Sequence, residues 1–475
     1  MLLRYFYDDK LAQASYLVGC LENGEALIID PARDTQPYLD AAAAEGLTIA
    51  HVTETHIHAD FVSGSRKLAH QTGARLYLSD MGDADWKYTF TDENEDENVI
   101  LLHDGDSWMV GNVRIEALHT PGHTPEHLAF RMTDTLGASE PLGIFTGDFL
   151  FVGDVGRPDL LEEAAGIKDT REIGARQQFH NVQQFKEMPD YLQIYPGHGA
   201  GSACGKALGS LPTTTLGYEK LFNPAFQFDD EDEGQFVAWL LADQPEAPRY
   251  FAQMKMVNRD AQPLTDTDDI NILPPGDIHA ILEKDCLIID ARPQEDFAQG
   301  HIPGTLGIPP TRKFNTYAGW FVDFEQPVYL IVDEASLAER VEELRAIGVE
   351  DISGIFLADA VMQYAQYDKS VMLTHISPAE THQAAMQDGV QIVDVRGKQE
   401  YAAGHIDNAL NVPLGYLPAH LDDLPRDRLI VLQCETGVRS QIASSFLEKS
   451  GFHNVASLSG GLENWRESGL PIANS

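Results

Sequence analysis

The amino-acid sequence predicts an α/β fold in which an αββα sandwich is followed by two smaller α/β domains with parallel sheets. Three observations support this prediction. The 475 residues are too many for one small core, and the hydrophobic content of 43% is ordinary for globular domains. Four strand ends in the first half each carry a side chain able to bind a metal ion, and two segments of the second half repeat each other. We expect domains at residues 1–255, 265–370 and 374–475, with a polar linker near 258–267.

The charge balance limits the partners of the chain. There are 74 acidic against 33 basic residues, and the formal net charge of -41 repels nucleic acids and anionic membranes. The first residues lack the apolar core of a signal peptide, and no apolar run is long enough to span a bilayer. We therefore expect a cytoplasmic protein with no nucleic-acid or membrane partner, and the sequence leaves open whether it forms a homo-oligomer.

The elements of the first half follow from turn and helix-end signals. Residues 16–29 are predicted to form two strands because the Asn23-Gly24 pair favours a tight hairpin turn. Glycine ends two predicted helices, and apolar runs predict the strands between them. These helices are expected at 34–45 and 62–72, and the strands at 47–53, 74–78, 113–118, 143–146 and 191–195.

The run Thr55-His56-Ile57-His58-Ala59-Asp60-Phe61 follows one of these strands. Two histidines and an aspartate at alternating positions of a loop can face a single point, and imidazole and carboxylate are ligands of borderline metals. The run is therefore predicted to be a metal-binding loop. Histidines outside such motifs are interpreted as packed or hydrogen-bonded residues, namely His51, His70, His119 and His127.

Three further strand ends carry metal-capable side chains. His123 lies in Thr-Pro-Gly-His-Thr, where proline and glycine force a sharp turn. Asp148 follows Thr-Gly, and His198 follows Tyr-Pro-Gly. These motifs, in this order after the His56 loop, predict one metal site at an edge of the sandwich.

The four motifs together resemble those of the metallo-β-lactamase superfamily, over about the first 250 residues. In its hydrolytic branch, which includes the glyoxalase II thioesterases, the loop reads His-x-His-x-Asp-His, and its last two residues build a second metal position. Phe61 stands at the place of that last histidine. A second metal would find only Asp60, His198 and a shared Asp148, so we expect one metal ion.

The persulfide dioxygenases of the same superfamily hold a single iron. The resemblance implies that His56, His123 and Asp148 bind one Fe(II) per chain and leave positions open for substrate and O2. It further implies that His58, Asp60 and His198 orient these ligands, bind substrate or themselves contact the metal.

Two residues near the expected site are candidates for substrate binding. Arg157, in a segment that resembles the Gly-Arg segment of the family, is expected to hold an anionic substrate or to form a structural ion pair. Cys204 follows His198 closely and is expected either to meet the sulfur of the substrate or to be a small buried side chain.

The second half contains a repeat with a spacing of 104 residues. Residues 287–292 align with 391–396, and each is followed by an acidic residue, an aromatic residue and Gly-His-Ile. Buried strands that alternate with helices predict two parallel α/β modules.

Cys434 lies between a predicted strand and a predicted helix in the second copy. Backbone N–H groups and the helix dipole at such a place favour thiolate over thiol. The loop Cys-Glu-Thr-Gly-Val-Arg resembles the active loop of the rhodanese sulfurtransferases and is one residue too short for the phosphate loop of tyrosine phosphatases. The resemblance implies that Cys434 carries a persulfide, that Arg439 favours anionic substrates, and that Glu435, Thr436 and Gly437 contact substrate.

The first copy has Asp333 at the corresponding strand end and no cysteine in its loop. Cys286 precedes the first strand of that copy and is expected in its core. The middle module is therefore expected to be an inactive rhodanese-like domain that serves as a spacer or a docking surface.

The domain order resembles that of bacterial persulfide dioxygenase-sulfurtransferase fusions, which clear sulfide. We expect the first domain to oxidise a low-molecular-weight thiol persulfide with O2 to sulfite, and Cys434 to pass sulfane sulfur to sulfite, giving thiosulfate. Two alternatives remain, a dinuclear zinc thioester hydrolase with a rhodanese tail and a non-catalytic sulfur-relay scaffold.

Overall fold

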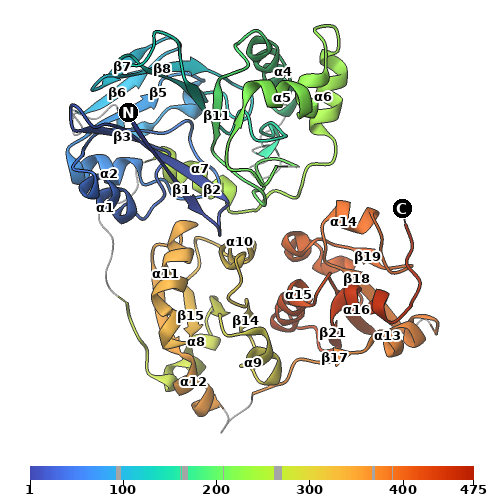
Figure 1. The fold of residues 1–475 in the computed structure, drawn as a ribbon. Coiled ribbons are helices and arrows are strands. Elements are labelled where there is room, and N and C mark those ends of the chain that lie inside the picture. Colours follow the sequence, from blue (N-terminus) through green and yellow to red (C-terminus); the bar gives the residue numbers. More distant parts are fainter. Residues whose placement is uncertain are drawn as a thin grey trace. The chain divides into compact units, whose positions relative to one another are not determined.

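The computed structural model describes residues 1–91, 98–160, 162, 170–206, 208–260, 270–365, 370–387 and 389–474. The chain forms two compact units (Figure 1). The first unit comprises Met1–Asp266 and Ala346–Gly348, and the second comprises Thr267–Arg345 and Val349–Ser475. The expected domain start at 265 lies outside the described residues. Among the described residues, no helix has the length and apolar character needed to cross a membrane.

The first unit is built on two six-stranded sheets. The first sheet has the order β1-β2-β3-β4-β5-β6, and the second has the order β12-β11-β10-β9-β8-β7. The first sheet contains β1 (Leu2–Asp8), β2 (Gln13–Cys20), β3 (Glu25–Ile29), β4 (Thr48–Thr53), β5 (Arg75–Ser79) and β6 (Val99–Leu102). The second contains β7 (Ser107–Val110), β8 (Val113–His119), β9 (Leu128–Asp134), β10 (Gly143–Gly147), β11 (Gln193–Pro196) and β12 (Thr214–Thr215).

Helices cover the outer faces of both sheets (Figure 1). The described α-helices are α1 (Gln36–Ala44), α2 (Ser65–Thr72), α4 (Arg171–Lys186), α5 (Leu216–Phe222), α6 (Glu233–Leu241) and α7 (Phe251–Arg259). One apolar core lies between the sheets, a second lies under α1 and α2, and a third lies under α4, α5 and α6. These layers confirm the predicted αββα sandwich, and burial of three apolar faces is its main source of stability.

The metal motifs follow strands that run in the same direction. β3, β4 and β5 are parallel neighbours, and β10 is parallel to β11. The loop of His56 follows β4, Asp148 follows β10, and His198 follows β11. His123 lies in the turn between the antiparallel strands β8 and β9. The predicted strands therefore form and end where the sequence placed the metal ligands.

The second unit contains two parallel sheets, which confirms the predicted pair of α/β modules. The first sheet, in the order β14-β13-β15-β16, is formed by β13 (Leu287–Asp290), β14 (Leu306–Gly307), β15 (Val328–Val332) and β16 (Ile352–Leu357). The second, in the order β17-β21-β20-β18-β19, is formed by β17 (His375–Ile376), β18 (Val390–Asp394), β19 (Leu410–Asn411), β20 (Leu429–Gln433) and β21 (Val455–Leu458). The described α-helices around them are α8 (Ile278–Leu282), α9 (Gln294–Gln299), α10 (Phe314–Gly319), α11 (Leu337–Ala346), α12 (Ala358–Ala365), α13 (Pro378–Ala385), α14 (Lys398–Ala402), α15 (Val438–Lys449) and α16 (Gly461–Glu467).

The repeated residues make the same contacts in both modules. Arg292 binds the carboxylate of Asp290 with Nε and Nη2 and donates to the Gly300 carbonyl at 2.9 Å. Arg396 binds Asp394 in the same way and donates to the Gly404 carbonyl at 2.7 Å. The shared motif therefore fixes the start of each module, and in the second copy Arg396 also pairs with Glu435 of the cysteine loop at 3.0 Å.

The Gly415→Ala substitution is expected to destabilise the second unit by about 1–3 kcal/mol, the usual cost of overpacking. A Cβ at Gly415 would stand 1.8 Å from Cε3 of Trp320, so the indole would have to move. Urea unfolding of the full chain measures the effect. Gly276→Ala is the matched control, because its Cβ would meet Oη of Tyr364 at an ordinary 3.5 Å. Equal stability of the two variants would contradict the tight contact at Gly415.

Candidate metal centre and cysteine loop

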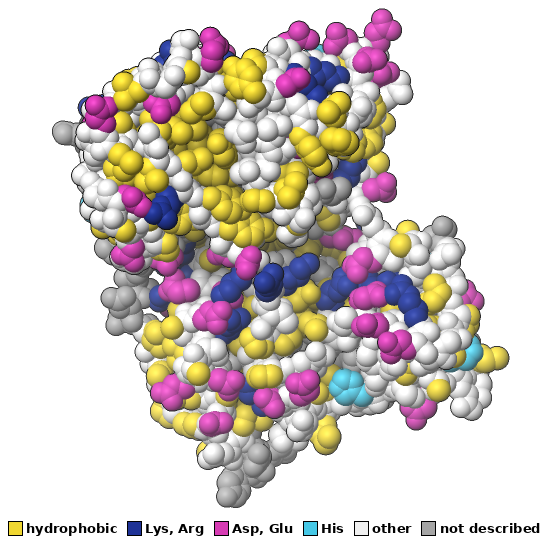
Figure 2. All heavy atoms as spheres, viewed as in Figure 1, with side chains coloured by type: hydrophobic (Ala, Val, Ile, Leu, Met, Phe, Trp, Pro, Cys, Tyr) yellow, Lys and Arg dark blue, Asp and Glu magenta, His cyan; other side chains and the backbone are white. Residues whose placement is uncertain are grey.

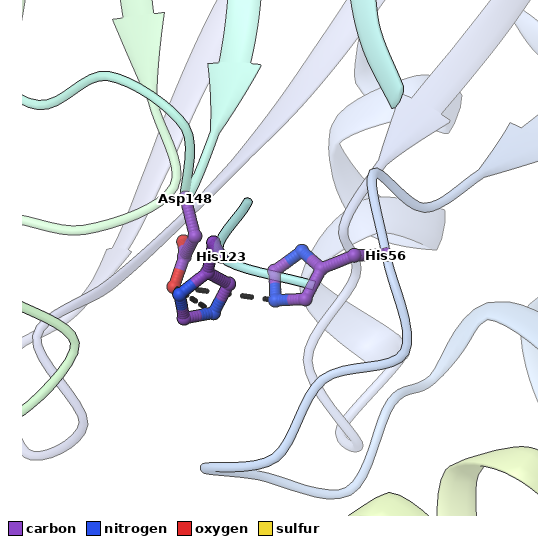
Figure 3. A group of neighbouring side chains, drawn as sticks. All are labelled: His56, His123 and Asp148. Carbon is purple, nitrogen blue, oxygen red and sulfur yellow. Dashed lines mark ion pairs between the residues drawn. The ribbon is translucent and has the colours of Figure 1, made fainter. Parts of the chain in front are cut away.

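Three side chains from three separate loops meet in the first unit. His56, His123 and Asp148 are all buried, and their ligand atoms lie within 4.8 Å of one another. Asp148 Oδ2 is 3.4 Å from His123 Nε2 and 4.0 Å from His56 Nε2. Figure 3 shows the two rings and the carboxylate pointing toward one another. The structure thus brings together the three residues expected to bind the metal.

The hydrogen bonds of the two rings direct Nε2 into this group. His123 Nδ1 donates to the Arg157 carbonyl at 2.9 Å, and His56 Nδ1 lies 3.0 Å from Thr55 Oγ1. Burial lowers the pKa of both histidines, that of His56 well below its usual value. Both rings are therefore neutral near pH 7 and keep a lone pair on Nε2, which is the form that binds a metal.

Several polar atoms in this region lack the partners that burial requires. Among the described residues, Asp148 Oδ1 and Oδ2, His58 Nδ1 and His198 Nε2 are buried without a hydrogen bond. Buried polar atoms are rarely left so, because each costs free energy. A divalent cation held at roughly 2.0–2.2 Å by imidazole and carboxylate would satisfy Asp148, so the donor set fits a metal.

A second group of ligand atoms lies beside the first. His198 Nε2 is 3.1 Å from Asp60 Oδ2 and 3.4 Å from Asp148 Oδ2, and its Nδ1 donates to the Ala12 carbonyl at 3.0 Å. The Cys204 thiol completes a buried trio with Asp60 and His198 that could itself hold a metal. The fold therefore adds Cys204 to the residues that the sequence offered for a second metal.

His58 turns toward a residue that the sequence motifs did not include. Its Nε2 lies 3.1 Å from Asp30 Oδ1, and the backbone N–H of Thr55 donates to the same oxygen at 2.6 Å. Burial alone would lower the pKa of His58, but the carboxylate of Asp30 raises it to about 9. The Phe61 ring packs 4.4 Å from the His58 ring. A pattern in the sequence could have pointed to Asp30, because this residue directly follows the buried strand β3, as the other metal-capable residues follow their strands.

The loop of His56 is also held from a distant helix. Asn258 Nδ2 donates to the carbonyls of His58 at 2.7 Å and Phe61 at 2.8 Å. Asn258 was expected in a polar linker, but it belongs to α7 and is 4% exposed. The linker prediction was therefore wrong at this residue. Residues 261–267 lie outside the described residues.

The Asp30→Asn substitution is expected to weaken metal binding about 10–100-fold, because an amide cannot hold both Thr55 and His58 as the carboxylate does. The measurement is competition of the full chain against a chelator. Asp34→Asn serves as the matched control, since Asp34 is exposed and caps the Gln36 backbone at 3.0 Å, which asparagine also does. An unchanged metal affinity in Asp30→Asn would refute this supporting role.

Arg157 was expected either to hold an anionic substrate or to form a structural ion pair, and the structure shows it in an ion pair with Asp159. The side chain is 1% exposed, and its Nε and Nη2 bind both oxygens of Asp159 at 2.8 and 2.7 Å. Its Nη1 donates to the Ala203 carbonyl, and its backbone N–H donates to the Cys204 carbonyl at 3.0 Å. Arg157 thus holds the segment that carries Cys204. Burial raises the pKa of Cys204 to about 12, so this residue is a thiol at neutral pH.

Cys434 lies in a closed loop between β20 and α15. It is 1% exposed, its Sγ accepts the backbone N–H of Gly437 at 3.1 Å, and Ser440 Oγ lies 3.7 Å away. Gly437 has φ of 107°, a conformation that glycine adopts without strain, and α15 begins at the next residue. The loop therefore presents the backbone N–H of Gly437 to the sulfur, as expected for a cysteine that precedes a helix.

The other predicted loop residues take part in ion pairs or face solvent. Arg439 Nη1 and Nη2 bind both oxygens of Glu400 at 2.6 and 2.7 Å. Glu435 pairs with Arg396 at 3.0 Å and with Arg466. Thr436 is exposed. Glu400 is the acidic residue of the repeat in the second copy, and the sequence motifs did not predict its pairing with Arg439.

Two family models match the chain. The metallo-beta-lactamase superfamily matches residues 8–198, and the rhodanese-like domain matches residues 275–353 and 377–468. A solved structure, the metallo-beta-lactamase from Staphylococcus aureus subsp. aureus COL, is 43% identical and covers 75% of this chain and 99% of its own, with a TM-score of 0.68.

Curated relatives of the first domain carry two activities. The mitochondrial persulfide dioxygenase of Bos taurus is 28% identical over 49% of this chain and 78% of its own length. A hydroxyacylglutathione hydrolase of Synechococcus sp. is 30% identical over 38% of this chain and 63% of its own length, so less than two thirds of that relative is spanned.

A sulfurtransferase of Allochromatium vinosum is 35% identical over 20% of this chain and 90% of its own length.

These matches confirm the resemblances inferred from the motifs. The chain belongs to the metallo-β-lactamase superfamily through its first domain, which is homologous to persulfide dioxygenases, and it carries two rhodanese-like domains after it.

Proposed function

We propose that the chain oxidises a low-molecular-weight thiol persulfide in its first domain and transfers sulfane sulfur in its last. The first reaction converts R–S–SH, O2 and water into R–SH, sulfite and two protons. The observation that carries this proposal is the buried group of His56, His123 and Asp148, two imidazoles and one carboxylate on one face. Such a face leaves neighbouring coordination positions open, as in the non-haem iron oxygenases.

A bound Fe(II) would supply the redox chemistry that O2 needs at this face. The residues of the chain hold and shape the site. His56, His123 and Asp148 would be the ligands, and the Arg157 carbonyl fixes the ring of His123. Phe61 is 1% exposed and limits water on the His58 side. Cys204 remains a thiol, so it meets a persulfide anion as a weak hydrogen-bond donor without charge repulsion.

The last domain would carry the transfer step. The thiolate of Cys434 attacks the outer sulfur of a second R–S–SH, releases R–S⁻ and keeps that sulfur as a persulfide. Sulfite then removes the sulfur, giving thiosulfate. The backbone N–H of Gly437 points at Sγ and stabilises its negative charge in both halves of the cycle. The coupled reactions together would remove sulfide-derived sulfur.

The alternative is a dinuclear zinc thioester hydrolase. It is favoured by the second trio of Asp60, His198 and Cys204, and by the similarity to a hydroxyacylglutathione hydrolase. Cysteine sulfur, imidazole and carboxylate are ligand types that Zn²⁺ takes, and a bound zinc would itself deprotonate the Cys204 thiol.

Metal analysis with two activity assays separates the two functions. We expect about one iron per chain, oxygen uptake with glutathione persulfide, and sulfite formed in proportion to O2. Two zinc ions per chain with turnover of S-lactoylglutathione, and no oxygen uptake by iron-loaded protein, would establish the hydrolase instead. A chain that holds the metal but shows neither turnover would support a scaffold role.

A further inference from the structure

Three consecutive residues, Glu126, His127 and Leu128, follow the turn of His123 and lead into the strand β9. All three are fully buried, at 0% exposure. Histidine is scarce on the face of the first unit that Figure 2 shows, whereas His127 is buried together with the expected ligands His56 and His123. The contacts of these three residues reach both of the other loops that carry an expected ligand.

Glu126 and Leu128 hold the backbone on both sides of His56. The backbone N–H of Ile57 donates to Glu126 Oε1 at 2.8 Å, and the backbone N–H of Leu128 donates to the Thr55 carbonyl at 2.7 Å. One bond fixes the residue before His56, and the other fixes the residue after it. Because these groups are buried, water cannot replace either bond. The path of the backbone through His56 is therefore set by this segment.

His127 connects the same segment to the loop of Asp148. Its Nε2 accepts the backbone N–H of Asp148 at 3.1 Å, and its Nδ1 lies 2.8 Å from Thr120 Oγ1. Since Nε2 accepts, Nδ1 carries the proton of the neutral ring and donates to that hydroxyl. The ring also stacks on the ring of His56, with centroids 5.2 Å apart and an interplanar angle of 29°. His127 therefore contacts both of the other expected ligands.

The segment is itself held by short contacts. The backbone N–H of Thr120 donates to the His127 carbonyl at 3.0 Å, and Ser79 Oγ donates to the Glu126 carbonyl at 2.5 Å. The first of these bonds closes the turn from which His123 reaches the metal group. One rigid turn thus carries one expected ligand and also holds the loops of the other two.

We propose that Glu126 and His127 are positioning residues of the metal centre, which hold the loops of His56 and Asp148 in the arrangement that a metal ion requires. This inference rests on the proposed function, because it concerns the same ligands. Ordering the loops in advance removes the free-energy cost of ordering them when the metal binds, and so raises the affinity. Groups that orient metal ligands from behind typically change metal affinity about 10–100-fold.

The contact of Glu126 is tested with cobalt(II) and the full chain. Cobalt(II) is the probe because its visible absorption reports the coordination geometry, and competition with a chelator gives its affinity. Glu126→Leu leaves the buried N–H of Ile57 without its acceptor. We expect this variant to bind cobalt about 10–100-fold more weakly than the parent, with a changed visible spectrum at saturation. Glu126→Gln keeps an oxygen acceptor at this place and should restore the parent affinity and spectrum.

The contact of His127 is tested by His127→Phe, which keeps a ring but removes the acceptor for the Asp148 N–H. Cobalt affinity should again fall about 10–100-fold. His119→Phe is the matched control, because His119 Nε2 contacts the Pro125 carbonyl inside the same turn at 2.9 Å, and it should keep the parent affinity. Thr120→Val is a milder variant that removes the hydroxyl at His127 Nδ1, and it should lose about three- to tenfold, the effect of one neutral hydrogen bond.

Thermal unfolding of the metal-free variants separates positioning from general destabilisation. Positioning predicts that the gain in Tm on adding cobalt falls with the affinity and returns in Glu126→Gln. Parent affinity in both Glu126→Leu and His127→Phe would refute the inference, and so would an equal loss in Glu126→Gln and Glu126→Leu. If the two larger changes prevent folding, Thr120→Val decides, and parent affinity in that variant refutes the inference.

The parent chain distinguishes failure of this inference from failure of the proposed function. A parent that binds no cobalt would overturn both. A parent that binds cobalt, but whose iron-loaded form consumes no oxygen with glutathione persulfide, would overturn the proposed function alone, and the affinities of the variants would still decide the positioning role.

Discussion

Asp148→Ala is expected to reduce oxygen uptake about a thousandfold or more, while sulfur transfer from added persulfide to added sulfite continues. Asp148 is fully buried, and its Oδ2 faces Nε2 of His56, His123 and His198 at 4.0, 3.4 and 3.4 Å. It is the carboxylate of the group with His56 and His123, and it also lies beside His198 of the second group. Without it, neutral imidazoles alone would have to compensate a dication in a site that water barely enters. Oxygen consumption and iron content of the purified variant measure the effect.

Asp190→Ala is the matched control for this substitution. Asp190 belongs to the same unit, its side chain is 77% exposed, and it pairs with Lys220 at the surface. Iron content and oxygen uptake should equal those of the parent chain. If Asp148→Ala retained both iron and oxygen uptake, the metal would have to lie elsewhere, and the group of His56, His123 and Asp148 would lose its assigned role.

The grouping of the three residues expected to bind the metal could be predicted because each is marked by local sequence. A histidine after an apolar run, or in a Pro-Gly turn, is placed by the strand that precedes it, and parallel strands bring their ends to one edge. His56, His123 and Asp148 carry such signals, and the structure brings them together. The repeat likewise predicted two parallel modules. In the structure its two copies make equivalent ion pairs, Asp290 with Arg292 and Asp394 with Arg396.

The supporting residues could not be predicted in the same way, because tertiary contacts place them. Asn258 reaches the His58 loop from 200 residues away, and no local pattern marks it. Cys204 joins Asp60 and His198 through a segment held by Arg157. The sequence motifs therefore did not show that a thiol lies beside Asp60 and His198. Phe61 still argues for one metal, and Cys204 makes metal analysis more decisive than the sequence alone suggested.

Contacts of the middle module with its neighbour could likewise not be predicted from local sequence. The absence of cysteine from its loop predicts that this module has no sulfur nucleophile at that place. The packing of Trp320 and Phe321 against the neighbouring module depends on how two α/β modules associate, and this is not encoded in either repeat alone. The contacts between the two modules could therefore not be predicted from the repeat.

Cys434→Ser is expected to abolish thiosulfate formation, by at least about a thousandfold, while oxygen uptake and sulfite release stay at the parent rate. A serine oxygen cannot accept and return sulfane sulfur as a persulfide does. Ser is close to Cys in size, so the loop contacts around residue 434, including the Gly437 N–H, should persist. Sulfite should then accumulate, because the first domain still produces it. Ion chromatography of sulfite and thiosulfate, beside oxygen consumption, measures both halves of the reaction.

Cys286→Ser distinguishes loss of the reactive sulfur from a general effect of replacing a buried thiol. Cys286 lies in the core of the middle module, where its Sγ donates to the Ile281 carbonyl at 3.4 Å, and a hydroxyl can keep that contact. This control should form thiosulfate at the parent rate. Thiosulfate formation that survives in Cys434→Ser would mean that another group accepts the sulfur, and the buried Cys204 beside the metal group would be the first residue to test by the same substitution.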